Sequence, residues 1–288
     1  MTVLVVGDVV TDVVAVLSGE PAPGSDRPAV IRTRGGGAGA NVAVHLAALG
    51  TDVVLTGVVG ADPAGAALTA ELRAAGVRLA IRAAPGVATG TIVSLVEPGG
   101  QRSMLADRGA NLELRPEDLP QPPDGGHLHL SGYTLLDDGP RAAGLAALAA
   151  AAGAGCTISV DPASTGPLAR YGTDRWLADT AAATVLLPNA DEARLLTGCA
   201  DAEQAARQLA DRHRVVAVSL GAEGALWAEG EELVHRPAHP ATVVDTTGAG
   251  DAFTAGLLAA WLRGATAAEA LDAGLSRAAA VVSRPGAR

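Results

Sequence analysis

The stretch at residues 245–253, DTTGAGDAF, has small residues directly before an apolar segment, and it decides how the rest of the chain is interpreted. We expect a helix over Ala249–Leu262, preceded by a strand over Thr242–Val244. At a helix N-terminus the first backbone N–H groups lack partners and the helix dipole is positive, so an anion can bind there. The candidate anion hole consists of Gly248, Ala249 and Gly250.

Asp251 falls in the first turn of this expected helix, beside the candidate anion hole. A carboxylate repels a bound anion, so affinity does not explain its place. It could instead take the proton from a hydroxyl that attacks a phosphate. The alternative is an acidic residue that only stabilises the helix N-terminus. The nine-residue context favours the general base.

A second glycine-rich turn, RGGGAGANVA at residues 34–43, precedes an expected helix over Ala40–Leu49. Glycine permits positive φ and a close approach of ligand to backbone, which applies to Gly36 and Gly37. Asn41 would present an amide from the first helical turn. The turn is not a GxGxxG directly after the first strand, so we expect no dinucleotide site.

Short β-branched segments alternate with Ala- and Leu-rich segments along the chain. Strands are expected at Val3–Val6, Val53–Thr56, His127–Leu130, Thr157–Val160, Val185–Leu187 and Val215–Ser219. Further helices are expected at Ala64–Ala75, Arg141–Ala152, Ala202–Asp211 and Ala267–Val282. This alternation predicts one α/β domain over residues 1–288, with a doubly wound, mostly parallel sheet and helices on both faces.

Two segments, Val13–Arg34 and Ile92–Leu105, interrupt this alternation with short pieces around Pro and Gly turns. We expect them to form a small antiparallel sheet that projects from the main sheet and covers a site as a lid. Arg102 and Arg108 fall in or beside the second segment. We expect both to be solvated surface residues, the alternative being contact with an acidic or phosphorylated substrate.

Polar residues follow several expected strands, and the carboxyl edge of a parallel sheet would bring them together. Asp8 and Asp12 follow the first strand, either as loop caps or as acceptors of hydrogen bonds from substrate hydroxyls. Asn189 and Glu192, in PNADE at 188–192, have the spacing of a capping box, and could also contact phosphate or hydrated Mg²⁺. The stretch SLGAEG at 219–224 predicts a tight turn, either a plain hairpin or one wall of a nucleotide site.

Composition excludes several classes of protein. The net charge is −10, which argues against a nucleic-acid partner. All 21 basic residues are Arg. The chain therefore has no lysine for a Walker A motif, for the phosphate-binding strand of a protein kinase, or for a Schiff base. The two cysteines lie far apart, and neither a signal peptide nor a membrane span is evident, so we expect a cytoplasmic protein without a membrane partner.

Taken together, these motifs resemble those of the ribokinase-like, or PfkB, carbohydrate kinases. The matching stretches are GGGAGAN at 35–41, PNADE at 188–192, SLGAEG at 219–224, DTTGAGDAF at 245–253 and SRPGA at 283–287. They occur in the family's order over nearly the whole chain. The resemblance implies a ribokinase-like fold with a small β-sheet lid that often forms a homodimer interface. It also implies Mg²⁺-dependent transfer of the ATP γ-phosphate to a hydroxyl of a sugar or related metabolite.

The resemblance implies roles for individual residues, position by position. Asp251 is then the catalytic base, and Gly248, Ala249 and Gly250 are the anion hole. The implied substrate contacts are Asp12, Gly36, Gly37 and Asn41. Asn189 and Glu192 would act on phosphate and Mg²⁺, Glu192 through water, and the implied nucleotide contacts are Ser219, Gly221 and Gly224. Asp245 and Thr247 match positions that hold a monovalent cation, such as K⁺, in some members.

The chain departs from ribokinases proper at Val10 and Ala38, where those enzymes carry Asn and Lys, which argues against ribose as the substrate. The chain stops at Arg288, without the family's longer C-terminal tail, so we expect an incomplete K⁺ site. We therefore expect an ATP-dependent kinase of a small sugar or sugar-like metabolite. A nucleoside (adenosine-like) kinase is the alternative in the same class. A catalytically weak regulator that binds nucleotide or sugar is the alternative from another class.

Overall fold

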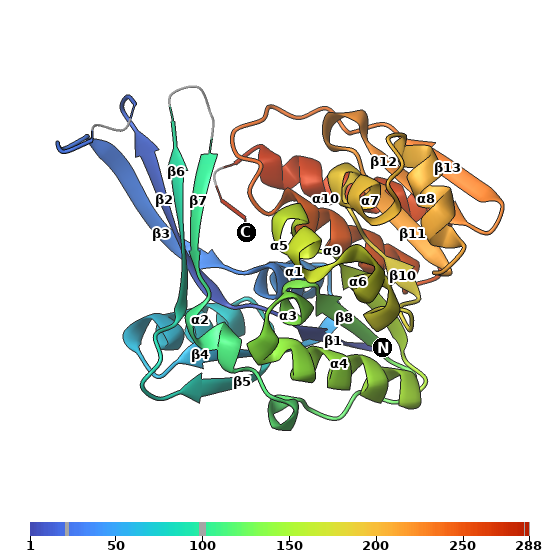
Figure 1. The fold of residues 1–288 in the computed structure, drawn as a ribbon, viewed down its shortest axis with the longest axis horizontal. Coiled ribbons are helices and arrows are strands. Elements are labelled where there is room, and N and C mark those ends of the chain that lie inside the picture. The colour runs from blue at the N-terminus through green and yellow to red at the C-terminus, as the bar shows by residue number, and fades with distance from the viewer. Residues whose placement is uncertain (21–22, 98–101, 285, 288) are drawn as a thin grey trace.

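The computed structural model describes residues 1–20, 23–97, 102–284 and 286–287, with the side chain of Arg102 outside the described part. Its main sheet has nine strands in the order β13-β12-β11-β10-β9-β8-β1-β4-β5 (Figure 1). The strands are β1 (Thr2–Val6), β4 (Asp52–Gly60), β5 (Arg78–Ala84), β8 (His127–Ser131), β9 (Thr157–Asp161), β10 (Val185–Leu186), β11 (Val215–Ser219), β12 (Ala225–Glu229) and β13 (Glu232–Arg236). Pairing is parallel from β11 to β5, and β12 and β13 add an antiparallel edge.

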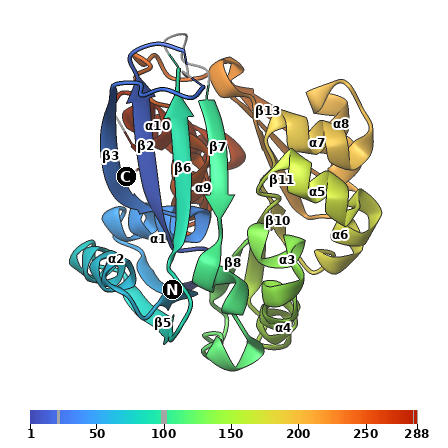
Figure 2. The same cartoon turned by 60° about the vertical axis from the view of Figure 1, so that its left-hand side comes forward.

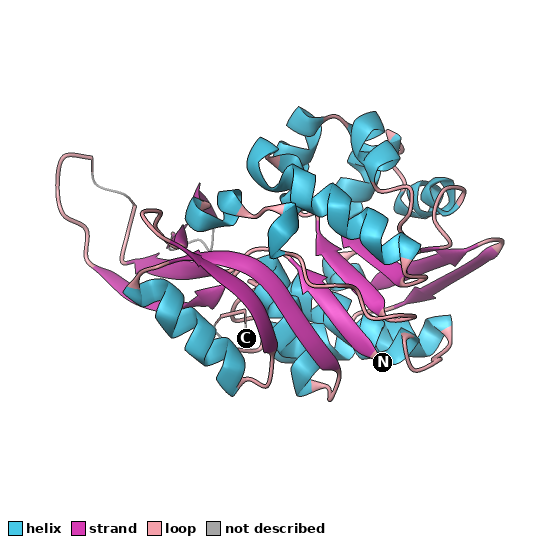
Figure 3. Cartoon of the chain, turned by 90° about the horizontal axis from the view of Figure 1, so that it is seen from below, coloured by secondary structure: helices cyan, strands magenta, loops and turns pink. Residues whose placement is uncertain are grey.

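Helices cover both faces of this sheet, as Figure 3 shows. One layer consists of α1 (Ala38–Ala48), α2 (Pro63–Ala74), α9 (Ala249–Trp261) and α10 (Ala267–Val282). The other consists of α4 (Asp138–Gly153), α5 (Thr165–Tyr171), α6 (Thr173–Asp179), α7 (Ala190–Thr197) and α8 (Ala202–Ala210), with the short α3 (Tyr133–Leu136) before α4. Successive strand residues point to opposite layers, so Val3 and Val5 lie in one core and Leu4 and Val6 in the other. The predicted fold class is confirmed.

A separate four-stranded sheet projects from the main body (Figures 1 and 2). Its order is β3 (Ala29–Gly36), β2 (Val10–Leu17), β6 (Gly90–Val96) and β7 (Arg102–Asp107). The expectation of an antiparallel sheet is wrong for the central pair, because β2 and β6 run parallel. The parallel strands β1 and β5 lead into β2 and β6 respectively, so both enter the small sheet in the same direction.

The strand expected at Thr242–Val244 is absent, and these residues form a loop. The side chains of Val243 and Val244 are 65% and 54% exposed, so the apolar run has no sheet to pack on. Instead, the N–H groups of Val244 and Asp245 donate to the carbonyl of Val282, which fastens the loop to the end of α10. Across the described ranges, no helix combines the length and apolarity needed to cross a bilayer.

Candidate active site

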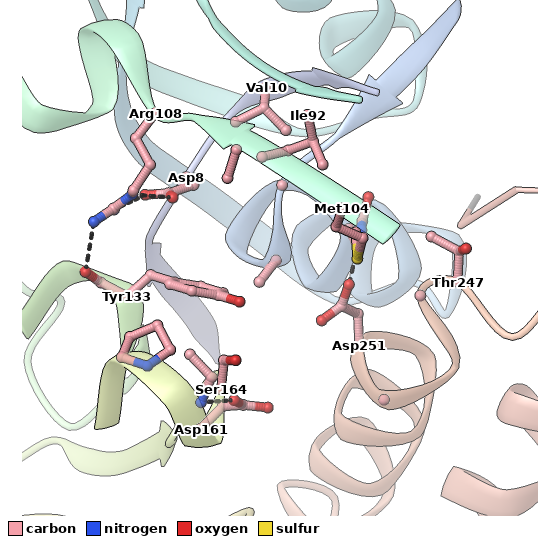
Figure 4. A pocket seen from close by; sticks show the side chains of 18 of the residues that line it. Asp8, Val10, Ile92, Met104, Arg108, Tyr133, Asp161, Ser164, Thr247 and Asp251 are labelled. Carbon is pink, nitrogen blue, oxygen red and sulfur yellow. Dashed lines mark hydrogen bonds and ion pairs between the residues drawn. The ribbon is translucent and has the colours of Figure 1, made fainter. Parts of the chain in front are cut away.

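A cavity of about 850 Å³ lies where the carboxyl edge of the main sheet meets the small sheet and the N-terminus of α9. Figure 4 shows Val10, Ile92 and Met104 of the small sheet on one side of this space and Asp161 and Ser164 on the opposite side. Asp8, Arg108 and Tyr133 line one flank, and Asp251 and Thr247 line the other. The cavity therefore collects residues from distant parts of the chain.

The helix α9 presents Asp251 to this cavity from its first turn, as predicted. The Asn41 side chain, in the first turn of α1, donates to Asp251 Oδ2 over 2.7 Å. Asn41 is 4% exposed, so this contact fixes the carboxylate from a rigid support. Two motifs that lie 210 residues apart thus meet at one carboxylate.

The glycines around this helix start differ in what surrounds them. Gly248 has φ +75° and precedes α9, and a Cβ there would lie 2.6 Å from the Cα of Ala287, so only glycine fits. A Cβ at Gly250 would meet nothing within 4 Å. Gly248 and Gly250 line the cavity, and Ala249 is not among the lining residues. The open space at Gly250 is what a bound anion at the helix N-terminus requires.

Asp12 lines the cavity from within β2, so the interpretation of Asp12 as a loop cap is wrong. A Cβ at Gly36, on the paired strand β3, would overlap the Asp12 carboxylate. Gly37, with φ +99°, lines the cavity at the start of α1. The glycine-rich turn thus makes room for Asp12 at the junction of β3 and α1.

Arg108 is not the solvated surface residue that the sequence predicts. Its guanidinium donates from Nε and Nη2 to both oxygens of Asp8, over 3.0 and 2.6 Å, and its side chain is 13% exposed. It also donates to the carbonyl of Tyr133 over 3.0 Å and pairs with Asp137. Its position after β7 carries it into the junction of the small sheet with the main body, where burial requires such pairing. Asp8, also expected as a loop cap, is thereby held at the cavity.

Two carboxylates also line the cavity, the buried Glu192 and the partly buried Asp161. Burial raises the pKa of Asp161 to about 6. Burial and the nearby Asp161 carboxylate raise the pKa of Glu192 to about 8. Asp161 was not predicted as a site residue. It ends the strand β9 as Asp8 follows β1, and that shared position is the signal in the sequence that points to it.

Asn189 and Glu192 form the capping box of α7, each accepting the other's backbone N–H over 2.9 Å, and both line the cavity. Ser219 also lines it, whereas Gly221 and Gly224 lie in the turn between β11 and β12, outside the lining. In the described residues no group of three or more His, Cys, Asp or Glu side chains is placed to hold a metal ion. Asp161 and Glu192 still fit Mg²⁺ bound through water, because Mg²⁺ keeps several waters and needs few carboxylates.

Asp245 and Thr247 lie in the loop before α9. Asp245 Oδ1 accepts the N–H of Thr247 over 2.9 Å, and Oδ2 accepts the N–H of Gly286 over 3.0 Å. The carboxylate therefore joins this loop to residues that follow α10. Thr247 lines the cavity.

Comparison with known proteins decides the family. The profile described as pfkB family carbohydrate kinase matches residues 2–288. The chain belongs to the PfkB family of carbohydrate kinases. An ATP-dependent ribose-1-phosphate kinase of Halopiger xanaduensis is 35% identical over 275 residues, covering 92% of this chain and 87% of the relative. A fructokinase of Klebsiella pneumoniae is 35% identical over 235 residues, covering 78% of this chain and 76% of the relative.

Solved structures of this family have the same fold. An adenosine kinase from Sinorhizobium meliloti superposes with a TM-score of 0.88 at 28% identity, over 99% of this chain and 95% of that one. A ribokinase from Thermotoga maritima gives a TM-score of 0.85 at 26% identity, over 100% and 94%. PfkB carbohydrate kinases transfer phosphate to hydroxyl groups of sugars or nucleosides, and such kinases are the relatives found here. The predicted family and enzyme class are confirmed.

Proposed function

We propose that this chain transfers the γ-phosphate of ATP to a hydroxyl of a small sugar or sugar-like metabolite, with Asp251 as general base. The observation that carries the proposal is the position of Asp251. It faces the cavity from the first turn of α9, beside the open backbone at Gly250, and Asn41 orients it. A base and an anion site side by side are what phosphoryl transfer to a hydroxyl requires.

In this mechanism the acceptor hydroxyl lies between Asp12 and Asp251. Asp12 accepts hydrogen bonds from other hydroxyls of the acceptor and so orients it, with Gly36, Gly37 and Asn41 shaping that end of the cavity. Asp251 takes the proton from the attacking hydroxyl. The unpaired N–H groups at the start of α9 stabilise negative charge on the transferring phosphoryl group.

The nucleotide would lie toward Ser219, with Gly221 and Gly224 shaping the turn that follows. Asn189 and Glu192, together with Asp161, are the residues that would hold hydrated Mg²⁺. Bound there, Mg²⁺ supplies positive charge that offsets the charge of the phosphates. Asp245 and Thr247 remain the candidate position for K⁺. The hydrogen bonds that Asp245 already accepts from two backbone N–H groups support only weak dependence on that ion.

A nucleoside is the second candidate acceptor. Val10, Ile92 and Met104 present apolar side chains to the cavity from the small sheet (Figure 4). These side chains could cover a flat base, which a simple sugar lacks. A non-catalytic regulator is disfavoured because Asp251 and its partner Asn41 are both present and in contact.

The decisive experiment measures ATP turnover with a panel of sugars and nucleosides, for the wild type and for Asp251→Asn. The amide keeps the shape of the side chain but cannot accept the proton, so kcat should fall about 10²–10⁴-fold while ATP still binds. Asp174→Asn is the matched control, since it changes an exposed acidic residue in the first turn of α6. An Asp251→Asn enzyme with more than about half the wild-type kcat would disprove the assignment.

We also propose a homodimer through the small sheet. Ile31 and Leu105 are 64% and 60% exposed, on the face opposite Met104, which lines the cavity. Large apolar side chains exposed on a sheet face favour burial against a partner. The test is the molar mass in solution of the wild type and of Ile31→Asp. The wild type should be a dimer and the variant a monomer, and equal masses would count against this interface.

A further inference from the structure

His45, in α1, holds Ala287, which lies beyond the end of α10. His45 Nε2 lies 2.9 Å from the carbonyl oxygen of Ala287, and both residues are buried, at 1% and 4% exposure. On the other side of the ring, Nη2 of Arg277, in α10, lies 3.1 Å from His45 Nδ1. The imidazole therefore bridges α10 and Ala287 through its two nitrogens.

The chemistry of arginine fixes the tautomer of this ring. A guanidinium carries only donors, so His45 Nδ1 must accept from Arg277. The neutral imidazole then carries its proton on Nε2 and donates it to the carbonyl of Ala287. Arg277 and the Ala287 carbonyl therefore require the same tautomer, in which the ring presents a donor to the C-terminal segment.

The segment that His45 holds is packed against the candidate anion hole. Gly248, which begins α9, lies so close to Ala287 that a Cβ would be 2.6 Å from the Ala287 Cα. The neighbouring Gly286 donates its N–H to Asp245 Oδ2, in the loop that leads to α9. Residues 286–287 therefore support the start of α9 from behind.

The helix α1 contacts both parts of the site. Asn41 and His45 are four residues apart on α1, so their side chains lie on one face of the helix. Asn41 binds Asp251, and His45 binds Ala287 behind Gly248. Contacts from α1 therefore hold both ends of the Gly248–Asp251 turn, and α1 itself packs against α9.

We propose that His45, with its tautomer set by Arg277, is a positioning residue for phosphoryl transfer: it holds Gly286–Ala287 against Gly248 and so keeps the anion hole in register with Asp251. The proposal rests on the proposed kinase function. Loss of the His45 contact would let the α9 start shift relative to the base. Small misplacements of this kind reduce the rate of the chemical step more than they reduce binding of the acceptor.

The test compares two amides that each imitate one ring nitrogen. His45→Gln places an N–H near the position of Nε2 and can still donate to Ala287. His45→Asn keeps an acceptor near Nδ1 for Arg277 but is too short to reach Ala287. Arg277→Met removes the N–H groups that donate to His45 Nδ1. Residue 277 is partly exposed, so the change leaves the buried side chains of the core in place.

The first readout is amide hydrogen exchange at Gly286 and Ala287 without substrate, and the second is steady-state kinetics. We expect faster exchange in His45→Asn, with kcat about ten- to a hundredfold lower and the acceptor KM within about twofold of wild type. Arg277→Met leaves the Nε2–H bond to Ala287 possible, so it should change both readouts in the same direction but less. His45→Gln should stay near wild type in both. Equal exchange, or equal kcat, in the Asn and Gln variants would overturn the proposal. A wild type that phosphorylates no acceptor would instead overturn the proposed function, and the exchange data would still decide whether His45 holds the segment.

Discussion

At the scale of single residues, the glycines of the cavity show which backbone atoms are packed by protein and which face open space. A Cβ at Gly36 would overlap the Asp12 carboxylate, and a Cβ at Gly248 would overlap Ala287, so any side chain at either position conflicts with the fold. Gly250 has no neighbour within 4 Å of a Cβ position, although it lies between Gly248 and Asp251. No protein atom therefore requires glycine at residue 250, and we propose that the need for a small residue comes from a ligand bound at the start of α9.

Gly250→Ala should accordingly separate activity from stability. The added methyl group meets no protein atom, and alanine favours a helix over glycine by about 0.5–1 kcal/mol, so the melting temperature should not fall. The methyl group would occupy space where the phosphoryl group binds, so kcat/KM for ATP should drop at least about tenfold, roughly 1.4 kcal/mol.

Gly153→Ala is the matched control for this change. Gly153 is also helical, at the end of α4, and a Cβ there meets nothing within 4 Å. It does not line the cavity, so both activity and folding should survive. If Gly250→Ala were as active as Gly153→Ala, no ligand would bind at the start of α9.

The residues that the sequence predicts and those that it misses differ in a physical way. Asp251 and Asn41 lie in short motifs whose local structure, a glycine turn before a helix, is set by neighbours in the chain. Asp161 and Arg108 act through partners far away in sequence, Glu192 for one and Asp8 for the other. No local pattern encodes such a pairing, so an isolated Arg is interpreted as a surface residue.

At the scale of elements, the small sheet is the part that local pattern describes least well. Turns and alternation predict its strands, but the parallel β2–β6 pair depends on how β1 and β5 are ordered in the main sheet. Strand order is a long-range property, and the sequence pattern does not contain it. The main sheet is easier to predict because its strands are buried on both faces and read as continuous apolar runs.

The small sheet is expected to close over the acceptor. Its strands β2, β6 and β7 contribute Asp12, Ile92 and Met104 to the cavity, so a bound acceptor gains contacts from the sheet. Closure also excludes water, which competes with the acceptor for the phosphoryl group.

Amide exchange in β6 and β7 should slow when a turned-over acceptor and a non-hydrolysable ATP analogue are added together. The helix α8 packs on the main sheet and contributes no residue to the cavity, so its amide exchange serves as the internal reference. Unchanged exchange in the small sheet at saturating ligand would show that it does not close.

At the scale of the whole molecule, a chain of polar side chains runs through the core of the main sheet. His127 bonds to Thr157 Oγ1 and Ser159 Oγ, each over 2.8 Å, and His129 bonds to Ser159 Oγ over 2.9 Å. Burial lowers the pKa of His127 to about 3, with a smaller contribution from His129, and lowers that of His129 to about 4. Both rings are therefore neutral in the folded protein near neutral pH.

These two histidines make stability depend on pH. An unfolded histidine titrates near 6.5, so between pH 6.5 and about 4 the unfolded chain binds protons that the folded protein does not. Stability is therefore lost as the pH falls through this range, by about 2 kcal/mol per histidine between pH 7 and pH 5. Asp161 and Glu192 act in the opposite direction, because their raised pKa values make the folded protein hold protons that the unfolded chain releases. The two effects offset each other, so the pH dependence of the wild type's free energy of unfolding does not by itself reveal either one.

The measurement is therefore a comparison of urea unfolding at pH 7 and pH 5 between the wild type and His129→Gln. Glutamine does not titrate, so the variant should lose less stability between the two pH values, by about 2 kcal/mol. His235→Gln, which changes an exposed ring on β13, is the control and should keep the wild-type difference. Any general destabilisation by the glutamine appears at both pH values and cancels in the comparison. Parallel behaviour of the wild type and His129→Gln would mean that the His129 ring binds its proton as readily in the folded protein as in the unfolded chain.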